Sequence, residues 1–369
     1  MKFDPLHYPF HSRRNLVFAK RGMVATSQPH AAQAGLSVLK AGGNAVDAAV
    51  ATASSLTVLE PTSNGIGGDA FALVWDGNKL HGLNASGPAP GNISIDKLKK
   101  KGFSEMPKLG WEPVTVPGAP GGWAKLNERF GELSFSEALK PAINYAKEGY
   151  PIQPTLGNSW KKAYETYSDL KERQYKYWKE TFAPRGRAPR IGEIWKSPDH
   201  ASTLKRIAES NADDFYKGEL AQKIEDFSIE EGGYIRKKDL AEFEPEWVKP
   251  LKVDYRGHQV WELPPNGQGL VALIALNILK GFNLDNKHSS DTYHKQIESL
   301  KLAFADGKKY ITDLEEMKYG PQKFLEDFYA EKRRNLIGEK ALEPKPGKPK
   351  DGGTVYLATA DKHGNMVSY

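Results

Sequence analysis

The first strong pattern of hydrophobic and polar positions lies between residues 27 and 60. Apolar residues recur at helical spacing in SQPHAAQAGLSVLK, which begins with the candidate cap Ser27 and stops at Gly42-Gly43. The next run, AVDAAVATASSLTVLE, follows the candidate cap Asn44 and is small or apolar at nearly every position. The pattern predicts one helix over 27–40 and a second over 45–60 that is buried on most sides.

After Pro61 the helical spacing of apolar residues ends and strand-like segments begin. The runs AFALVW and KLHGLN have strand character and are separated by the turn signal Asp76-Gly77-Asn78, which predicts a hairpin. A glycine cluster, GIGG at 65–68, precedes this hairpin. Phosphate-binding glycine loops stand between a strand and a helix, whereas this cluster lies between a helix and a strand, so the context argues against nucleotide binding.

The rest of the chain alternates between helical and strand-like segments. The Gly/Pro-rich run VTVPGAPGGW at 114–123 precedes two predicted amphipathic helices, and residues from about 155 to 250 are mostly helical, charged and rich in Trp and Tyr. Strands are predicted in LKVDYRGHQVWELPP, and helices in LVALIALNIL and DTYHKQIESLKLAFADGKKYI. Helices and strands do not alternate as regular βαβ units, so the pattern is typical of an α/β or α+β enzyme.

Composition and charge fit a soluble globular protein. The 369 residues are 39% hydrophobic and 27% charged, and the net charge of +6 is dispersed along the chain. A nucleic-acid-binding surface concentrates basic residues on one element, which this chain does not do. No stretch has the roughly 18 apolar residues that a membrane span needs, and the start lacks the apolar core of a secretory signal, so we expect a cytoplasmic protein.

Two kinds of site are disfavoured by residue type. The chain has no cysteine, which excludes disulfides, thiolate zinc sites and a cysteine nucleophile. His7 and His11 have a four-residue spacing, but Pro9 lies between them and no glutamate follows His7 as a zinc-protease motif requires. We therefore expect no metal and no cofactor.

The candidate chemistry lies near the end of the sequence, in KPKDGGTVYLATADKHGNMVSY. Gly352 and Gly353 give the peptide bond before Thr354 unusual conformational freedom, and Thr354 begins a predicted strand and hairpin. If the chain were cut at Gly353-Thr354, the threonine hydroxyl would be the nucleophile. Its own α-amine, with an ordinary pKa of about 7.7–8.0, would be the base. One residue would then supply both groups, without a histidine or cysteine.

Several segments, in order, resemble the γ-glutamyltranspeptidase family of N-terminal-nucleophile hydrolases. They are residues 22–75, VTVPGAPGGW, ELPPNGQGLVALIALNIL, AFADGKKYITD and TVYLATADKHGNMVS. The resemblance implies an α+β fold, the αββα sandwich, of which this chain carries only part because most of the small subunit is absent. It also implies a precursor that cuts itself before a threonine and then hydrolyses or transfers γ-glutamyl groups from amides such as glutathione.

By this resemblance Thr354 is the nucleophile and Gly353-Thr354 the bond that is cut. Residues 1–353 correspond to the large subunit, with a flexible linker at 343–353, and residues 354–369 to the first hairpin of the small one. The expected partners are a small amide substrate and the missing small-subunit portion of the same precursor, which carries the oxyanion donors. We expect no nucleic acid or membrane partner. Without those donors the 369-residue chain is expected to be inactive alone.

The sequence departs from the family pattern at two places, and the first affects the expected substrate. The family's R-E-x-A-P run, whose arginine binds the glutamate α-carboxylate, corresponds here to Ser86-Gly87-Pro88-Ala89-Pro90, so Ser86 replaces the arginine. Val355 and Tyr356 also stand where the family often has Thr and His. The first change leaves open a cephalosporin or glutaryl acylase of the same fold. An unprocessed, non-catalytic homologue is a third alternative, which the intact Gly-Gly-Thr disfavours.

Overall fold

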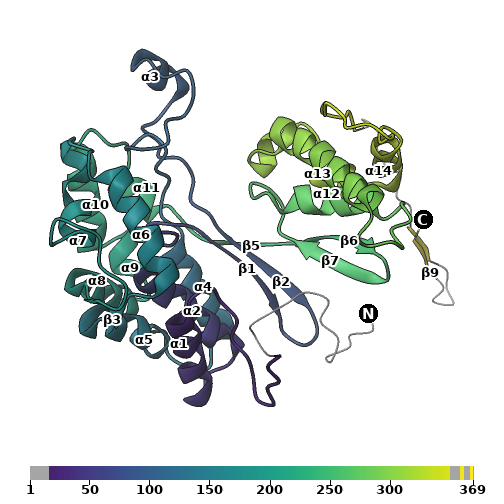
Figure 1. Cartoon of the computed structure of the whole chain (residues 1–369). Helices are drawn as coiled ribbons and strands as arrows, with labels where there is room; N and C mark the ends of the chain where they lie inside the picture. Colours follow the sequence, from purple (N-terminus) through teal and green to yellow (C-terminus); the bar gives the residue numbers. More distant parts are fainter. Residues whose placement is uncertain (1–15, 350–357, 361–365, 369) are drawn as a thin grey trace. The chain divides into compact units, whose positions relative to one another are not determined.

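A computed structural model describes residues 16–349, 358–360 and 366–368, and its elements are labelled in Figure 1. The chain divides into two compact units, and each is described by itself. Unit 1 comprises residues 1–71 and 84–246, and unit 2 comprises residues 72–83 and 247–369. The predicted catalytic residue, Thr354, and the bond before it lie outside the described residues.

Unit 1 is mainly helical. Its helices are α1 (Pro29–Lys40), α2 (Ala45–Leu59), α3 (Ile95–Lys100), α4 (Ala119–Phe130), α5 (Phe135–Glu148), α6 (Pro154–Tyr167), α7 (Lys176–Phe182), α8 (Pro198–Glu209), α9 (Asp213–Tyr216), α10 (Glu219–Glu230) and α11 (Lys237–Ala241), with a 3₁₀ turn, η1 (Arg173–Tyr175). Strands β3 (Tyr150–Pro151) and β4 (Ile194–Trp195) pair antiparallel.

Unit 2 packs three helices with a β-hairpin. The hairpin strands are β6 (Leu251–Tyr255) and β7 (His258–Glu262), the helices are α12 (Gly269–Leu279), α13 (Ser290–Tyr310) and α14 (Asp327–Arg334), and the 3₁₀ turns are η2 (Leu314–Glu316) and η3 (Pro321–Leu325). Helices α12 and α13 lie side by side, and α12 also packs on the hairpin (Figure 1). The unit has its own core, which includes Leu273, Ile274 and Leu302.

Three further strands form a small sheet. Strands β1 (Ala70–Trp75), β2 (Leu80–Ala85) and β5 (Glu246–Val248) form one sheet in the order β1-β2-β5. The predicted hairpin around Asp76-Gly77-Asn78 is therefore present. Near the end of the chain, β8 (Ala358–Ala360) and β9 (Met366–Ser368) pair antiparallel.

The first two predicted helices are present, with one change at a cap. Asn44 caps α2 as predicted, accepting hydrogen bonds from the Val46 and Asp47 backbone N–H groups. The cap of α1 is Gln28 and not Ser27: the Gln28 side chain accepts from Ala31 N, while the Ser27 hydroxyl donates to Glu60 Oε2. Because Pro29 occupies the first helical position, the cap must stand directly before it.

Helix α2 is buried along most of its length, as its composition predicts, and unit 1 is organised around it. Asp47 in its first turn is completely buried. Its carboxylate accepts from the N–H groups of Asn44, Glu132 and Leu133 and from the Asn127 side chain. Four donors at one carboxylate offset the cost of burying it and tie α2 to the end of α4.

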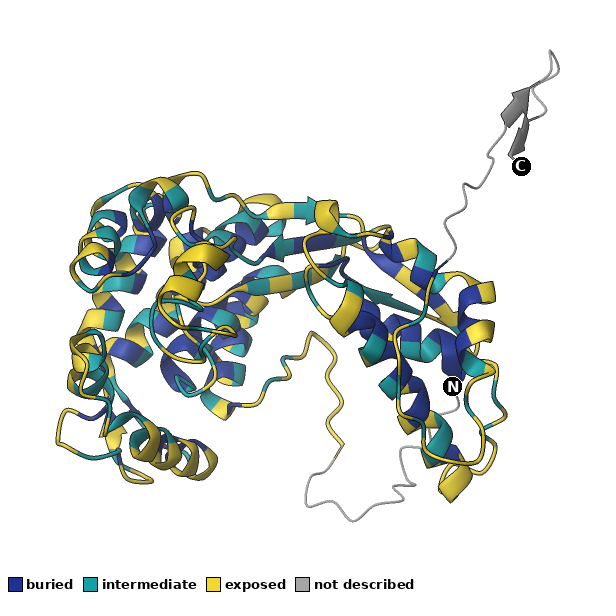
Figure 2. Ribbon diagram, turned by 90° about the horizontal axis from the view of Figure 1, so that it is seen from above, coloured by how far each residue is buried: buried dark blue, intermediate teal, exposed yellow. Residues whose placement is uncertain are grey.

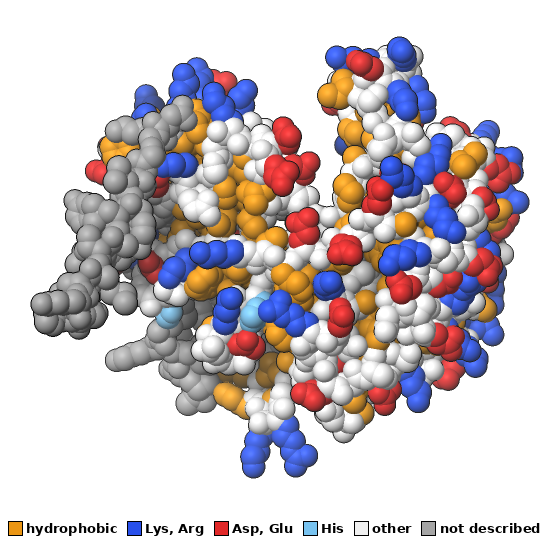
Figure 3. Space-filling model, turned by 180° about the vertical axis from the view of Figure 1, so that it is seen from behind, with side chains coloured by type: hydrophobic (Ala, Val, Ile, Leu, Met, Phe, Trp, Pro, Cys, Tyr) orange, Lys and Arg blue, Asp and Glu red, His pale blue; other side chains and the backbone are white. Residues whose placement is uncertain are grey.

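Burial follows the amphipathic pattern in both units. Figure 2 shows helices that are dark blue on one face and yellow on the other, as helices packed around a core should be. The aromatic residues of the middle segment contribute to the unit 1 core: Trp160 and Trp195 are buried with ring centroids 5.1 Å apart. On the face shown in Figure 3, lysine and arginine are interspersed with aspartate and glutamate. Among the described residues, no helix is both long and apolar enough to cross a membrane.

Candidate active site

The only predicted site residue that the structure describes is Ser86, which lies just after β2 in unit 1. Its backbone N–H and its hydroxyl both donate to Asn84 Oδ1, at 2.9 and 2.7 Å. This arrangement is a local turn in which the asparagine side chain fixes the residue two positions later. The turn directs the Ser86 hydroxyl proton toward Asn84, so the hydroxyl is not oriented to donate to a bound carboxylate.

The segment that carries Ser86 is held by very close backbone packing. A Cβ atom added to Gly87 would collide with the Val116 carbonyl, and one added to Gly118 would collide with the Ala85 carbonyl. Val116 N donates to Pro88 O at 3.0 Å, so residues 85–88 and 116–118 run directly against each other. Glycine is required at both positions because no side chain fits between the two backbones.

The GIGG loop joins the same packing. Gly68 O accepts hydrogen bonds from Gly118 N at 2.9 Å and from Ala119 N at 3.0 Å, at the start of α4. These donors would otherwise be unsatisfied at the helix N-terminus. The first turn of α4 therefore uses these two donors for hydrogen bonds within the protein. We call residues 65–68, 84–88 and 114–122 the loop junction.

The Tyr216 side chain binds the backbone of the loop junction. Its hydroxyl donates to Pro117 O at 2.8 Å and accepts from Gly121 N at 3.0 Å. Burial raises the pKa of Tyr216, so the phenol stays protonated and keeps its donor. A single side chain thereby fixes two backbone groups on either side of Gly118.

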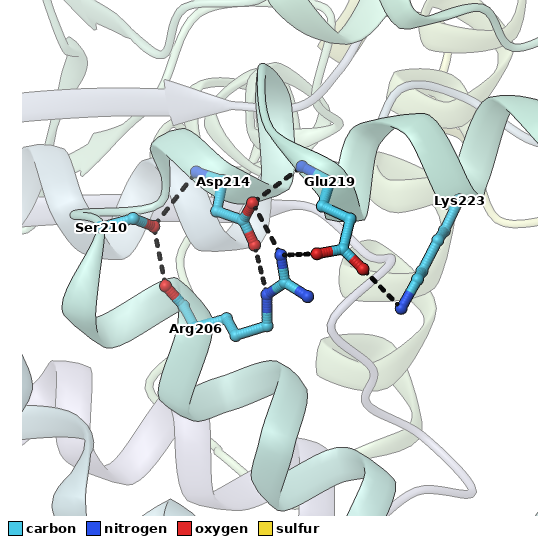
Figure 4. A network of polar contacts seen from close by, with 5 residues as sticks. All are labelled: Arg206, Ser210, Asp214, Glu219 and Lys223. Atoms are coloured by element: carbon cyan, nitrogen blue, oxygen red, sulfur yellow. Dashed lines mark hydrogen bonds and ion pairs between the residues drawn. The ribbon is translucent and has the colours of Figure 1, made fainter.

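Tyr216 is itself positioned by α9, which a surface network of charges anchors (Figure 4). Arg206 on α8 pairs with Asp214 on α9 and with Glu219 on α10, and Lys223 pairs with Glu219. Ser210 joins the network by donating to Arg206 O and accepting from Asp214 N. The guanidinium of Arg206 holds the pKa of Asp214 below its usual range and lowers that of Glu219 to about 2. The Arg206–Asp214 pair is partly buried and Glu219 is exposed, and the network fixes the corner between α8 and α10.

In unit 2, residues of the predicted linker 343–353 are described as far as 349. Lys345 O accepts from Arg333 Nη2 at 2.8 Å, and Gly347 N donates to Asp306 Oδ1 at 2.6 Å. The backbone at 345–347 is thus tied to α13 and α14. Residues 350–353 lie outside the described residues, so the flexibility of the linker next to the predicted cut stays a prediction.

Sequence reasoning missed the side chains that hold this segment. Asp306, Tyr329 and Arg333 are each 3% exposed or less, and all lie far from Ser86 in the sequence. The signal for Asp306 was present: it is a charged residue among apolar ones in LKLAFADG. Nothing in the sequence pattern identified its partners. Among the described residues, no cluster of His, Asp and Glu is arranged to hold a metal ion.

Comparison with known proteins places these features in a family. Residues 31–369 match the family described as Gamma-glutamyltranspeptidase. The chain is 34% identical over 358 residues to the glutathione hydrolase-like YwrD proenzyme of Bacillus subtilis (strain 168), covering 96% of this chain and 67% of that protein. The chain thus spans about two thirds of the length of this relative.

Solved structures agree with the sequence match. The cephalosporin acylase from Bacillus halodurans is 59% identical with a TM-score of 0.90, over 100% of this chain and 68% of that one. The Helicobacter pylori gamma-glutamyltranspeptidase is 28% identical with a TM-score of 0.84, over 92% of this chain and 100% of that one. These similarities confirm the predicted α+β, N-terminal-nucleophile hydrolase fold. The chain belongs to the gamma-glutamyltranspeptidase family.

Proposed function

We propose that the protein is a proenzyme that cleaves itself between Gly353 and Thr354 and then acts as an N-terminal threonine amide hydrolase or acyltransferase. The observation that carries this proposal is the family match, which continues through the Gly-Gly-Thr sequence to residue 369. The B. subtilis relative is named as a proenzyme, which supports processing.

Self-cleavage follows from the chemistry of threonine. The Thr354 hydroxyl attacks the Gly353 carbonyl carbon, and the acyl group moves from the Thr354 nitrogen to its oxygen, giving an ester and a free α-amine. Water hydrolyses the ester, leaving a carboxylate on Gly353 and the hydroxyl on Thr354. The new α-amine has an ordinary pKa near neutrality, so it can take the hydroxyl proton in the next reaction.

Turnover uses the same two groups on a substrate. The hydroxyl attacks the substrate's amide carbonyl, the acyl group is transferred to Thr354, and the amine leaves with a proton from the α-ammonium. Water or a second amine then takes the acyl group. A γ-glutamyl amide such as glutathione is the first substrate candidate, because the B. subtilis relative is named as glutathione hydrolase-like.

A specific observation favours a second candidate, an amidase for cephalosporin-like or glutaryl side chains. Ser86 replaces the family arginine, and the sequence has no arginine between Arg21 and Arg129. A neutral hydroxyl whose proton is directed to Asn84 does not replace a bidentate, charge-assisted pair with the α-carboxylate. The 59% identical structure is named as a cephalosporin acylase, which agrees with this substrate class.

Mass spectrometry of the full-length gene product on a denaturing gel tests the cleavage. We expect a fragment that begins at Thr354 and is missing in Thr354→Ala. A wild-type product that never splits would reject the proposal and favour a non-catalytic homologue. The cytoplasmic location stays a prediction, which cell fractionation with an antibody to the protein would check.

The substrate class is tested by comparing γ-glutamyl-p-nitroanilide with glutaryl-p-nitroanilide. Both carry a terminal carboxylate, and the glutaryl compound lacks the α-amine. If the protein is an acylase, the glutaryl compound has the higher kcat/KM. Ser86→Arg should raise kcat/KM for both compounds, because each carries the carboxylate that an arginine would bind. Ser104→Arg, which adds the same charge at an exposed loop position, is the control. A wild-type protein that strongly prefers the γ-glutamyl compound would reject the second candidate.

A further inference from the structure

A buried group of polar side chains lies between α13 and α14 in unit 2. Asp306 is completely buried, and Tyr329 and Arg333 are each 3% exposed. Arg333 Nη2 lies 3.1 Å from Asp306 Oδ1, and the Tyr329 hydroxyl donates to Asp306 Oδ2 at 2.9 Å. We call these three residues the clasp.

The clasp binds the backbone that leads toward the predicted cut. Asp306 accepts from Gly347 N, Arg333 donates to Lys345 O, and a fourth side chain, Tyr310, donates to Gly347 O at 2.7 Å. A Cβ atom added to Gly347 would collide with the Tyr329 hydroxyl. Glycine at 347 therefore lets the backbone approach the clasp closely enough to be bound on both its N–H and its C=O.

Stability alone does not explain this arrangement. A buried ion pair contributes little beyond its desolvation cost, and well-packed apolar residues often stabilise a protein more. Burial raises the pKa of Asp306 despite its partners, which is a sign of that cost. Apolar residues, however, cannot bind the N–H and C=O groups of a passing segment. The clasp, which carries this desolvation cost, is also the group of side chains that binds the backbone of residues 345–347.

The distance from the clasp to the predicted cut is short. From Gly347 to Gly353 there are six residues, and an extended chain spans at most about 3.3–3.6 Å per residue. The Gly353 carbonyl is therefore confined to within about 20 Å of Gly347. The next anchor upstream is Leu342, whose N–H is bound by Glu298 and whose carbonyl is bound by Lys301. From Leu342 the tether would be eleven residues.

We propose that Asp306, Tyr329 and Arg333 are positioning residues for self-cleavage, which bring the Gly353-Thr354 bond into its reactive geometry by holding residues 345–347. This inference rests on the proposed self-cleavage. After the cut, the clasp keeps residues up to Gly347 bound, and only the six residues 348–353 are free to leave Thr354. Only a short segment that ends at the new Gly353 carboxylate would then move away from Thr354.

The experiment follows cleavage of the full-length precursor over time, comparing wild type with Gly347→Ala. The added methyl group would collide with the Tyr329 hydroxyl and crowd the Arg333 side chain that binds Lys345 O, so we expect it to displace the whole segment 345–347 and leave Leu342 as the nearest anchor. Lengthening the segment between the anchor and Gly353 from six to eleven residues has an effect of its own. It lowers the probability that Gly353 is at the reactive position about 2.5-fold. Loss of orientation adds to this, so we expect cleavage to slow threefold or more. Gly338→Ala is the matched control because its added Cβ has nothing within 4 Å.

A second readout separates positioning from folding. Once the precursor is cleaved, turnover per mole of free N-terminal threonine should stay within twofold of wild type in Gly347→Ala. Tyr329→Phe, which keeps the ring and removes the hydroxyl, should also slow cleavage. Combined with Gly347→Ala, it should restore part of the cleavage rate, because the collision is then reduced.

Three results would overturn the inference while leaving the proposed function intact. They are cleavage of Gly347→Ala at the rate of Gly338→Ala, unchanged cleavage in Tyr329→Phe, and turnover per free threonine that falls as much as the cleavage rate. A wild-type precursor that never cleaves is a different result, because it rejects the proposed function itself.

Discussion

The loop junction of unit 1 and the clasp of unit 2 both fix a chain segment that is close in sequence to a predicted functional residue, but they do so by different means. The loop junction brings backbones into direct contact at Gly87 and Gly118. The clasp holds the backbone at 345–347 with side chains, two of them charged. The loop junction therefore depends on the absence of side chains at its glycines, and the clasp depends on the side chains that form it.

This difference determines how each region can vary. Backbones in direct contact leave no room for a side chain at Gly87 or Gly118, so the loop junction can change its chemistry only at other positions, such as Ser86. The clasp can be weakened stepwise, by removing a hydroxyl or a charge. We infer that substrate preference is adjusted on a rigid frame in unit 1, while the rate of self-cleavage is adjusted through side chains in unit 2.

The largest effect is expected for Gly118→Ala. Its methyl group would overlap the Ala85 carbonyl, and both partners are backbone, so neither can move aside without breaking the junction. We expect a loss of about 4 kcal/mol or more in the free energy of unfolding, measured by chemical denaturation. Gly67→Ala is the control, because its Cβ would have nothing within 4 Å and should change stability by less than about 1 kcal/mol. Equal stability in the two variants would contradict the comparison.

A smaller loss is expected for Asp306→Asn in the clasp. Asparagine keeps the size and one acceptor oxygen but leaves the buried Arg333 guanidinium without its counter-charge. Removing one partner of a buried pair costs about 3–5 kcal/mol, and the retained acceptor places this variant near about 3 kcal/mol. Asp291→Asn removes the partner of Lys295 on the exposed side of the same helix and should cost less than about 1 kcal/mol. If Asp306→Asn and Asp291→Asn lowered the free energy of unfolding by the same small amount, the clasp would not contain a buried charge that needs its partner.

Much of the fold could be predicted from periodicity and caps. Helix α2 was predicted from its small, apolar residues and Asn44, and the hairpin of β1 and β2 from its turn signal. The α1 cap was wrong because Ser27 and Gln28 are adjacent and only the position of Pro29 decides between them. Local sequence chooses an element reliably, whereas its end depends on a single hydrogen bond.

Less of the site could be predicted. The correspondence of Ser86 to the family arginine is a prediction from the sequence, which gave no sign of the hydrogen bonds from Ser86 to Asn84. The clasp joins residues 306, 329, 333 and 345–347 through tertiary contacts that follow no local period. Such contacts depend on how α13 and α14 pack, which hydrophobic patterning alone does not specify.

The smallest expected effect is the change of stability with pH. It compares groups in the two units whose surroundings shift their pKa. The clasp buries charge, whereas the aromatic core of unit 1 partly buries His200, whose ring lies near Phe182 and Trp195. Burial lowers the pKa of His200, so the unfolded chain binds a proton more readily than the folded one. Stability should therefore fall as pH drops below the unfolded value of about 6.5. Carboxylates with lowered pKa, such as Glu193 at about 2, keep their stabilising effect until the pH falls below about 4.5.

The range between pH 7.5 and 5 includes the ordinary histidine pKa of about 6.5, and comparing variants over this range isolates the contribution of His200. In wild type we expect the melting temperature to decrease over this range, and in His200→Phe to decrease less, because phenylalanine keeps the ring packing without the titrating nitrogen. His258→Gln removes an exposed histidine from β7 and should leave the wild-type pH dependence unchanged. If His200→Phe and His258→Gln shared the wild-type slope, His200 would not be the group that binds the proton. A lower slope in His200→Phe alone would show that the stability of unit 1 depends on keeping the partly buried ring of His200 neutral.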